Sequence, residues 1–472
     1  MEKFFKLKER NTTVKTEILA GLTTFMAMAY ILMVNANMFA NPFGDGTNVL
    51  GVSYGAVYIA TAISAVIGTV LIGLLANIPM AQASGMGLNA YFVYTVCVGM
   101  GFTYANALVM ILFDGIVFIL LTATGLRKKI FEGIPKSVRV AIPAGIGLFI
   151  AFIGMQNVGL VVDDSATLVN LHSFNIFSES FSWAVVMPIV VTVLALLAIG
   201  IMSQRKVKGA VLFGILGGAV AYYLLGFTVP GFYDGFSLGT MNPLTAFADF
   251  GTQSFAKVFT EGFDFSAYLA QGNSTGSLVF ALITSALAFC LVDMFDTIGT
   301  LYGACARGNM LTKEGDIPNM DKAMLADAIA TTTGAICGTS TVTTFVESSA
   351  GVAEGGRTGL TSLSTAFFFF VAMFLSPVAS LIPGCATAAA LIYVGVLMMN
   401  CVKDIDWLSP AAAVPAFLTV AIMAFTYNIS YGIAFGIISA LIINIFTGKI
   451  KETKATTWVI ALLFIAMFIV SH

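Results

Sequence analysis

Long apolar runs separated by short polar stretches account for most of the chain. The hydrocarbon core of a bilayer is about 30 Å thick, and a helix needs about 20 residues to cross it. We therefore expect a membrane-spanning helix wherever an apolar run approaches this length. Such runs lie at residues 16–40, 53–77, 105–124, 138–156, 183–202, 208–227, 277–303, 360–382, 386–402, 410–427 and 430–447.

Three further segments, 78–98, 324–338 and 339–355, are short or rich in glycine, serine and threonine. Small residues of this kind are typical of helices that pack closely against other helices. With these three, the pattern predicts an all-α polytopic membrane protein of fourteen transmembrane segments. The last apolar run, 458–470, is about two-thirds of a span, so we expect it at the membrane interface.

Composition agrees with this class of protein. Of the 472 residues, 58% are hydrophobic and only 10% are charged, which is too little charge to cover a soluble protein. The formal net charge of −2 gives no basis for a nucleic-acid partner. We expect no metal and no cofactor, because the six cysteines lack C-x-x-C spacing and only two histidines, His172 and His472, are present.

Basic residues predict the orientation, since cytoplasmic loops carry an excess of lysine and arginine. With the N-terminus inside and fourteen segments, every basic cluster falls on the cytoplasmic side, so both termini are expected there. The loop 228–276 then lies outside, and Lys257 is its single lysine. The basic clusters are "KFFKLKERNTTVK", "RKKIFEGIPKSVR", "QRKVK" and "GKIKETK".

The same loop divides the chain into two halves of seven segments. An odd number of segments means that the second half is inverted relative to the first. Loop charges agree, because the basic "QRKVK" of the first half corresponds to the uncharged "YNIS" of the second. Two inverted seven-span repeats are the architecture of secondary transporters, which bind substrate near the bilayer midplane.

The third segment of each half is interrupted by small residues. In each, an extended stretch ("IPMAQ" or "STVTTF") precedes a short helix, so we predict short extended strands in segments 3 and 10. Broken helices aim backbone N–H groups at a cavity, here those of Gly85, Gly87, Ser348 and Ser349. The alternative is that both are flexible packing segments.

Polar side chains lie at these breaks and in "LVDMFDTIGTLYG". Asn89 occupies the first break and Glu347 the second, while Asp293 and Asp296 share one face of a helix. Each central acid costs about 2.5–3.5 kcal/mol in a membrane, so a function must justify it. We expect the four side chains to converge, and one acid to bind and release a proton. A structural hydrogen bond is the alternative, above all for Asp296.

Other residues receive weaker assignments. Asp114 interrupts an apolar run and is interpreted as structural, while Asp327 and Glu354 lie nearer segment ends, where they can reach water. Phe345 is preferred for stacking on a planar ligand, over Phe25, Tyr30 and Phe295. Acids, an amide and an aromatic ring suit a flat heterocycle with N–H donors and carbonyl acceptors, whereas three acids repel an anion.

Four stretches of the chain resemble the azaguanine-permease-like branch of the nucleobase–cation symporters, the hypoxanthine, guanine and adenine permeases. They are "GLTTFMAMAYILMVN", "SGMGLNAYF", "VDMFDTIGTLYG" and "GTSTVTTFVESSAGVAEGGRTGLTS". The resemblance implies a uracil-permease-like fold and proton-coupled import of a purine base, with the proton as coupling ion. It matches Asn89, Asp293 and Glu347 to substrate and coupling residues, and Asp296 to a supporting acid. Ser84 departs from the proline that members often carry there.

The resemblance also implies a division into a core and a gate, in the cytoplasmic membrane. The expected divisions are 1–15 (cytoplasmic N-terminal segment), 16–125 and 277–383 (core), 126–228 and 384–448 (gate), 229–276 (extracellular linker) and 449–472 (C-terminal segment). The partners are then a purine base and the lipid bilayer, with a homodimer left open. Three alternatives remain: a permease for uracil, xanthine or an inorganic anion; an intramembrane acid-dependent enzyme; and a channel.

Overall fold

The computed structural model describes residues 2–124, 133–178, 181–228, 242–312, 317–450 and 453–470. The expected boundaries at 125–126 and 228–229 and part of the basic stretch "RKKIFEGIPKSVR" lie outside the described residues.

Within the described ranges, ten helices are long and apolar enough to cross a membrane, so the chain is a mostly helical polytopic membrane protein. Three of the ten are composite, since α2 continues into α3 beyond Ala29, α17 continues through η3 into α18, and α19 continues into η4. The ten are α2–α3 (Val14–Met28 and Tyr30–Ala40), α4 (Tyr54–Leu75), α6 (Tyr104–Thr124), α8 (Lys136–Asn157), α9 (Trp183–Gln204), α10 (Ala210–Thr228), α14 (Thr275–Arg307), α17–η3–α18 (Gly359–Ala372, Met373–Leu375, Ser376–Ala379), α19–η4 (Gly384–Met398, Met399–Asp404) and α21 (Ile429–Phe446).

The remaining elements are shorter or less apolar. The predicted segments 324–338 and 410–427 correspond to the helices α15 and α20, while 78–98 and 339–355 each consist of a strand and a short helix. The full set is α1 (Glu2–Phe5), β1 (Gln82–Ser84), α5 (Met86–Ala90), η1 (Tyr91–Gly99), β2 (Val161–Asp164), β3 (Leu168–Leu171), α11 (Pro243–Asp249), η2 (Phe250–Ser254), α12 (Lys257–Thr260), α13 (Ser266–Ala270), α15 (Met320–Cys337), β4 (Val342–Thr344), α16 (Ser348–Ala353), α20 (Pro410–Phe425) and α22 (Ala455–Val470).

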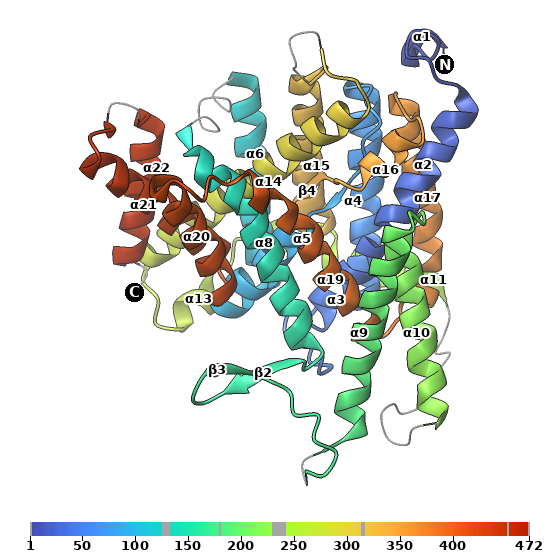
Figure 1. Cartoon of the computed structure of the whole chain (residues 1–472), viewed down its shortest axis with the longest axis horizontal. Helices are drawn as coiled ribbons and strands as arrows, with labels where there is room; N and C mark the ends of the chain where they lie inside the picture. The colour runs from blue at the N-terminus through green and yellow to red at the C-terminus, as the bar shows by residue number, and fades with distance from the viewer. Residues whose placement is uncertain are drawn as a thin grey trace.

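The helices pack as two groups that are each built from both halves of the chain. In one group, α4 lies against α15 and α17, and α6 lies against α14 and α15. In the other, α8 lies against α19 and α20, and α9 lies against α10 and α19. The β2–β3 hairpin projects at the end of the bundle away from the N-terminus (Figure 1).

Close backbone approach within each group requires glycine. A Cβ added to Gly359 at the start of α17 would lie 1.9 Å from the carbonyl oxygen of Gly73 in α4. A Cβ added to Gly395 in α19 would lie 2.4 Å from the carbonyl oxygen of Gly147 in α8. Glycine pairs of this kind let transmembrane helices approach closely enough for backbone van der Waals contact.

A buried glutamate ties the first transmembrane helix to the start of α17. Glu17 is fully buried, and its carboxylate accepts hydrogen bonds from the backbone amides of Arg357, Thr358 and Thr361. The hydroxyls of Thr358 and Thr361 donate to it as well, each at 2.7 Å. Because these donors surround a helix N-terminus, the helix dipole also favours the negative charge.

Candidate functional site

The two interrupted segments cross as a two-stranded antiparallel sheet. Ser84 in β1 is paired with Val342 in β4, so the strands predicted in the two segments meet each other. Gly85 follows β1 at a point where a Cβ would lie 2.6 Å from the side chain of Thr343. A Cβ on Gly87 would lie 2.4 Å from Ile146 of α8. The two glycines therefore allow α5 to fit between β4 and α8.

Asn89 is held by a chain of buried hydrogen bonds. Ser84 donates its hydroxyl to Asn89 Oδ1 at 2.7 Å, and it therefore accepts from Thr339, which lies 2.9 Å away. Thr339 in turn accepts from Asn35 Nδ2 at 3.1 Å. The opposite orientation of the Asn89 amide would bring Oδ1 against the carbonyl oxygen of Ser84, which now lies 3.4 Å from Nδ2. The amide orientation is therefore fixed by its neighbours.

Asp293 is fully buried and connects α14 to the sheet through one threonine. The Thr331 hydroxyl in α15 lies 3.1 Å from Asp293 Oδ2 and also 3.1 Å from the carbonyl oxygen of Val342 in β4. The backbone amide of Val342 donates back to the same hydroxyl oxygen at 3.3 Å. The Thr331 side chain alone thus connects the Asp293 carboxyl to β4.

Asp327 was expected to reach water, and this prediction is wrong, because its side chain is fully buried. Its carboxylate accepts from Gln82 Nε2 at 2.8 Å and from the Thr297 hydroxyl at 2.9 Å. The Thr344 hydroxyl lies 3.4 Å away. Asp327 thereby joins α15, α14 and both strands. Its position near the start of a weakly apolar segment gave no sign of this. Glu354 is exposed, as expected, and pairs with Lys208 at 2.6 Å.

Glu347 lies in the turn between β4 and α16, and it is only half-buried. Tyr30, the first residue of α3, donates its hydroxyl to Glu347 Oε1 at 2.6 Å. Asp296 is also half-buried, and its carboxyl interacts electrostatically with that of Glu347. The neighbouring Val346 is 55% exposed, so this turn is an open part of the molecule. Tyr30 was predicted only as a candidate stacking ring, and its contact with Glu347 was not predicted.

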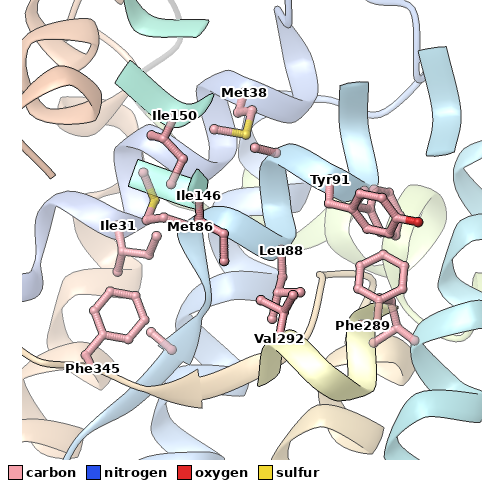
Figure 2. Packing of buried hydrophobic residues seen from close by; sticks show 14 of the residues in the cluster. Ile31, Met38, Met86, Leu88, Tyr91, Ile146, Ile150, Phe289, Val292 and Phe345 are labelled. Carbon is pink, nitrogen blue, oxygen red and sulfur yellow. The ribbon is translucent and has the colours of Figure 1, made fainter. Parts of the chain in front are cut away.

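Phe345 is buried at the end of β4, where its backbone amide donates to the carbonyl of Ala81 at 3.0 Å. Figure 2 shows its ring facing Ile31, with Met86 and Ile146 beyond. In the same view Leu88 of α5 lies against Val292 of α14. An apolar layer therefore covers one side of the sheet.

Three of the four backbone amides predicted to face a cavity, those of Gly85, Ser348 and Ser349, donate to carbonyls of the two broken segments. Gly85 donates to the carbonyl of Thr341, Ser348 to that of Phe345 and Ser349 to that of Val346. The Ser348 hydroxyl instead accepts from the amide of Ala81 at 3.0 Å, which links the second break to the first. These three amides are therefore already used within the protein.

The predicted residues thus lie in one region of the protein, where they form two separate sets. Glu347, Asp296 and Tyr30 gather at the open turn, while Asp293 and Asn89 lie in the buried layer beside the sheet. Thr331 and Val342 connect the buried set to β4, which leads directly into Glu347. The arrangement therefore consists of two half-buried acids at the turn and a third acid, Asp293, that is fully buried.

A separate cavity of about 270 Å³ lies between α3, α9 and α19. Three carboxamides, those of Asn37, Asn41 and Asn157, belong to its lining, together with Tyr222 and Thr387, and no carboxylate does. This cavity is an alternative place for a small polar ligand.

Broken segments that cross inside a bundle of spanning helices are typical of integral membrane transporters. The model of the Permease family (Xan_ur_permease) matches residues 15–435, and the chain belongs to this family.

The chain is similar over almost its whole length to curated members. It is 39% identical to the guanine/hypoxanthine permease PbuO of Bacillus subtilis, over 98% of this chain and 100% of that protein. It is 35% identical to the adenine permease AdeP of Escherichia coli, over 100% of this chain and 97% of that protein. A putative permease of Methanocaldococcus jannaschii is 40% identical, over 99% of this chain and 98% of that one.

Solved structures of low identity share the fold. The transmembrane domain of the cyanobacterial bicarbonate transporter BicA gives a TM-score of 0.59 at 14% identity, covering 89% of this chain and 97% of that domain. The overall structure of SLC26A9 gives 0.60 at 11% identity, covering 92% of this chain and 66% of that one.

Proposed function

We propose that this chain is a purine nucleobase permease that imports a base together with a proton. The observation that carries the proposal is the acid pair at the open turn, Glu347 with Asp296, placed where β4 breaks before α16. Relatives named guanine/hypoxanthine and adenine permeases support the substrate class. Proton coupling rests on the acids themselves, since buried acids in membrane segments serve proton relays in many transporters.

Each residue receives a role that follows from its groups. The Glu347 carboxylate accepts ring N–H groups of the base, and the Tyr30 hydroxyl holds that carboxylate in place. Asn89 and Asp293 supply the enclosed polar side of the site, and Asp296 supports Glu347. Phe345 offers a ring face to the planar base once Ile31 moves aside.

The helix packing supports alternating access between two bodies. The group of α2, α4, α6, α14, α15 and α17 corresponds to a core at 16–125 and 277–383, and the group of α8–α10 and α19–α21 to a gate at 126–228 and 384–448. In this proposal the chain has fourteen segments in two inverted sevens, counting the two broken ones, α15 and α20. Both termini are cytoplasmic, in the cytoplasmic membrane, and a homodimer through the gate remains open to test.

Radiolabelled hypoxanthine, guanine and adenine uptake tests the function in cells that lack their own purine permeases. We expect unlabelled hypoxanthine, guanine or adenine to compete with the uptake, uracil not to compete, and a protonophore to abolish the uptake. Competition by uracil or xanthine alone would indicate that the substrate is one of those bases. Uptake that survives the protonophore would contradict proton coupling.

Ser84→Ala removes the hydroxyl that orients Asn89. A hydrogen bond of this kind contributes about 1 kcal/mol, so we expect the KM for the purine to rise about threefold to tenfold. Ser380→Ala is the matched control, because Ser380 is exposed and its hydroxyl donates only to the carbonyl of Pro377. Equal KM values for the two variants would show that the orientation of Asn89 is unimportant.

A further inference from the structure

Asp114 lies at the level of Asp293 in the structure, although nothing in the proposed site uses it. Its helix, α6, crosses α15 so closely that a Cβ on the next residue, Gly115, would lie 2.3 Å from the hydroxyl of Thr332. The residue before Thr332 is Thr331, which bonds to Asp293. Since α6 packs against both α14 and α15, Asp114 lies on the helix that contacts the two partners of this hydrogen bond.

Asp114 faces α14 and is fully buried. Its side chain interacts with the carboxyl of Asp293 and with the thiol of Cys290, one turn earlier on the same helix. The elements packed against α6 are α14, α15, α12 and η1. Asp293 and Cys290 are the titratable groups of α14 that interact with Asp114, and η1 carries Tyr91, Tyr94 and Cys97. None of the described lysines and arginines forms a salt bridge with Asp114. On α15 and α12, Asp327 accepts from Thr297, and Lys257 pairs with Glu261.

Two buried carboxyls that interact electrostatically disfavour the state in which both are ionised. Each uncompensated charge costs several kcal/mol to bury, and repulsion between the two like charges raises that cost further. Sharing one proton removes one of the two charges, as in other buried carboxyl pairs. A pair of this kind is therefore a proton-holding group built into the bundle.

We propose that Asp114 and Asp293 together hold the coupling proton, with Asp114 as a proton-coupling residue in its own right. The inference rests on the proposed function and identifies the acids that carry the proton. In the cycle, one carboxylate oxygen of the pair accepts a proton from water on one side of the membrane, and the same O–H bond later gives it to water on the other.

Thr331 connects the pair to the substrate side. Its hydroxyl carries one proton and has two acceptors at 3.1 Å, Asp293 Oδ2 and the carbonyl of Val342. An ionised Asp293 attracts that proton more strongly than a neutral one, because charge-assisted hydrogen bonds are about twice as strong. Protonation of the pair therefore releases the hydroxyl to β4, the strand that leads into Phe345 and Glu347.

The test uses the purified full-length chain in proteoliposomes and two measurements with radiolabelled purine. Counterflow reports exchange, which moves no net proton, and accumulation under an acid-outside pH gradient reports coupling. We expect Asp114→Asn to lower the ratio of accumulation to counterflow at least tenfold. Asp114→Glu, which restores an ionisable carboxyl, is expected to recover a ratio within about threefold of wild type. Asp321→Asn, at an exposed position at the start of α15, is the control and keeps the wild-type ratio.

A wild-type ratio of accumulation to counterflow in Asp114→Asn overturns the proposal. This holds whether accumulation and counterflow both stay high or both fall, because a purely structural role lowers the two equally. If Asp114→Asn does not fold, Asp114→Ser is measured in the same way, with the same expected and contradicting ratios. Wild-type protein that shows neither counterflow nor accumulation overturns the proposed function and this inference with it. Wild-type protein that accumulates purine, with an unchanged ratio in the variants, overturns this inference alone.

Discussion

Glu347→Gln and Asp293→Asn are each expected to lower purine uptake about 100-fold while the protein still reaches the membrane. A glutamine at position 347 keeps one acceptor oxygen, so if that oxygen accepts from the Tyr30 hydroxyl, the N–H₂ group faces the N–H groups of the base. Losing a charge-assisted hydrogen bond and facing donor with donor costs about 3 kcal/mol, which is about 100-fold in kcat/KM. At position 293 the change also removes an acid from the buried pair, so coupling is lost along with binding.

The control variants neutralise exposed carboxyls close to the same elements. Glu354→Gln lies just past α16, and Asp321→Asn lies at the start of α15, both at exposed positions. Their uptake is expected to stay within about twofold of wild type, since surface ion pairs contribute about 0–1 kcal/mol. Undiminished uptake in both Glu347→Gln and Asp293→Asn would remove the site assignment. Membrane quantities are compared by immunoblotting, so that uptake is normalised to protein.

Glu17→Ala is expected to have the largest effect on stability. Its carboxylate is the acceptor for the amides of Arg357, Thr358 and Thr361 and for two hydroxyls. Removing one partner of a buried charged network costs about 3–5 kcal/mol, because the remaining groups stay buried without partners. We expect a lower Tm for the detergent-purified variant and a smaller monodisperse fraction on size exclusion.

Glu354→Gln again provides the comparison, because it removes a glutamate near the loop that Glu17 contacts, with little expected loss of stability. Its single ion pair to Lys208 is exposed, and the expected change in stability is at most about 1 kcal/mol. If the Tm of Glu17→Ala equals that of Glu354→Gln, the carboxylate of Glu17 does not hold α2 to α17. Glu17→Gln, which keeps one acceptor oxygen, should fall between the two.

The membrane class and the two broken segments were predictable because both depend on local sequence. Apolar length identifies spans such as α14, and the change from β-branched to small residues marks where β4 ends and α16 begins. The crossing of β1 with β4 is a pairing between residues about 260 positions apart in the sequence, and no local pattern specifies its register. The sequence therefore predicted the strands but not their contact.

Side-chain partners were harder to predict than positions. The structure places Asp296 near Glu347, whereas the contact of Tyr30 with Glu347 depends on how α2, which continues into α3 at Tyr30, packs beside α16. Asp327 was expected to reach water because its segment is weakly apolar, but α14, α15 and the sheet enclose it. Glu17 lies three residues into an apolar helix, and only the fold brings the donors of another segment to it.

The most direct measurement is a cryo-EM structure of the purified protein with a bound purine, such as hypoxanthine. We expect density for the base at the turn between β4 and α16, with a ring nitrogen within hydrogen-bond distance of Glu347. Density in the cavity lined by Asn37, Asn41 and Asn157, with none beside Glu347, would contradict it.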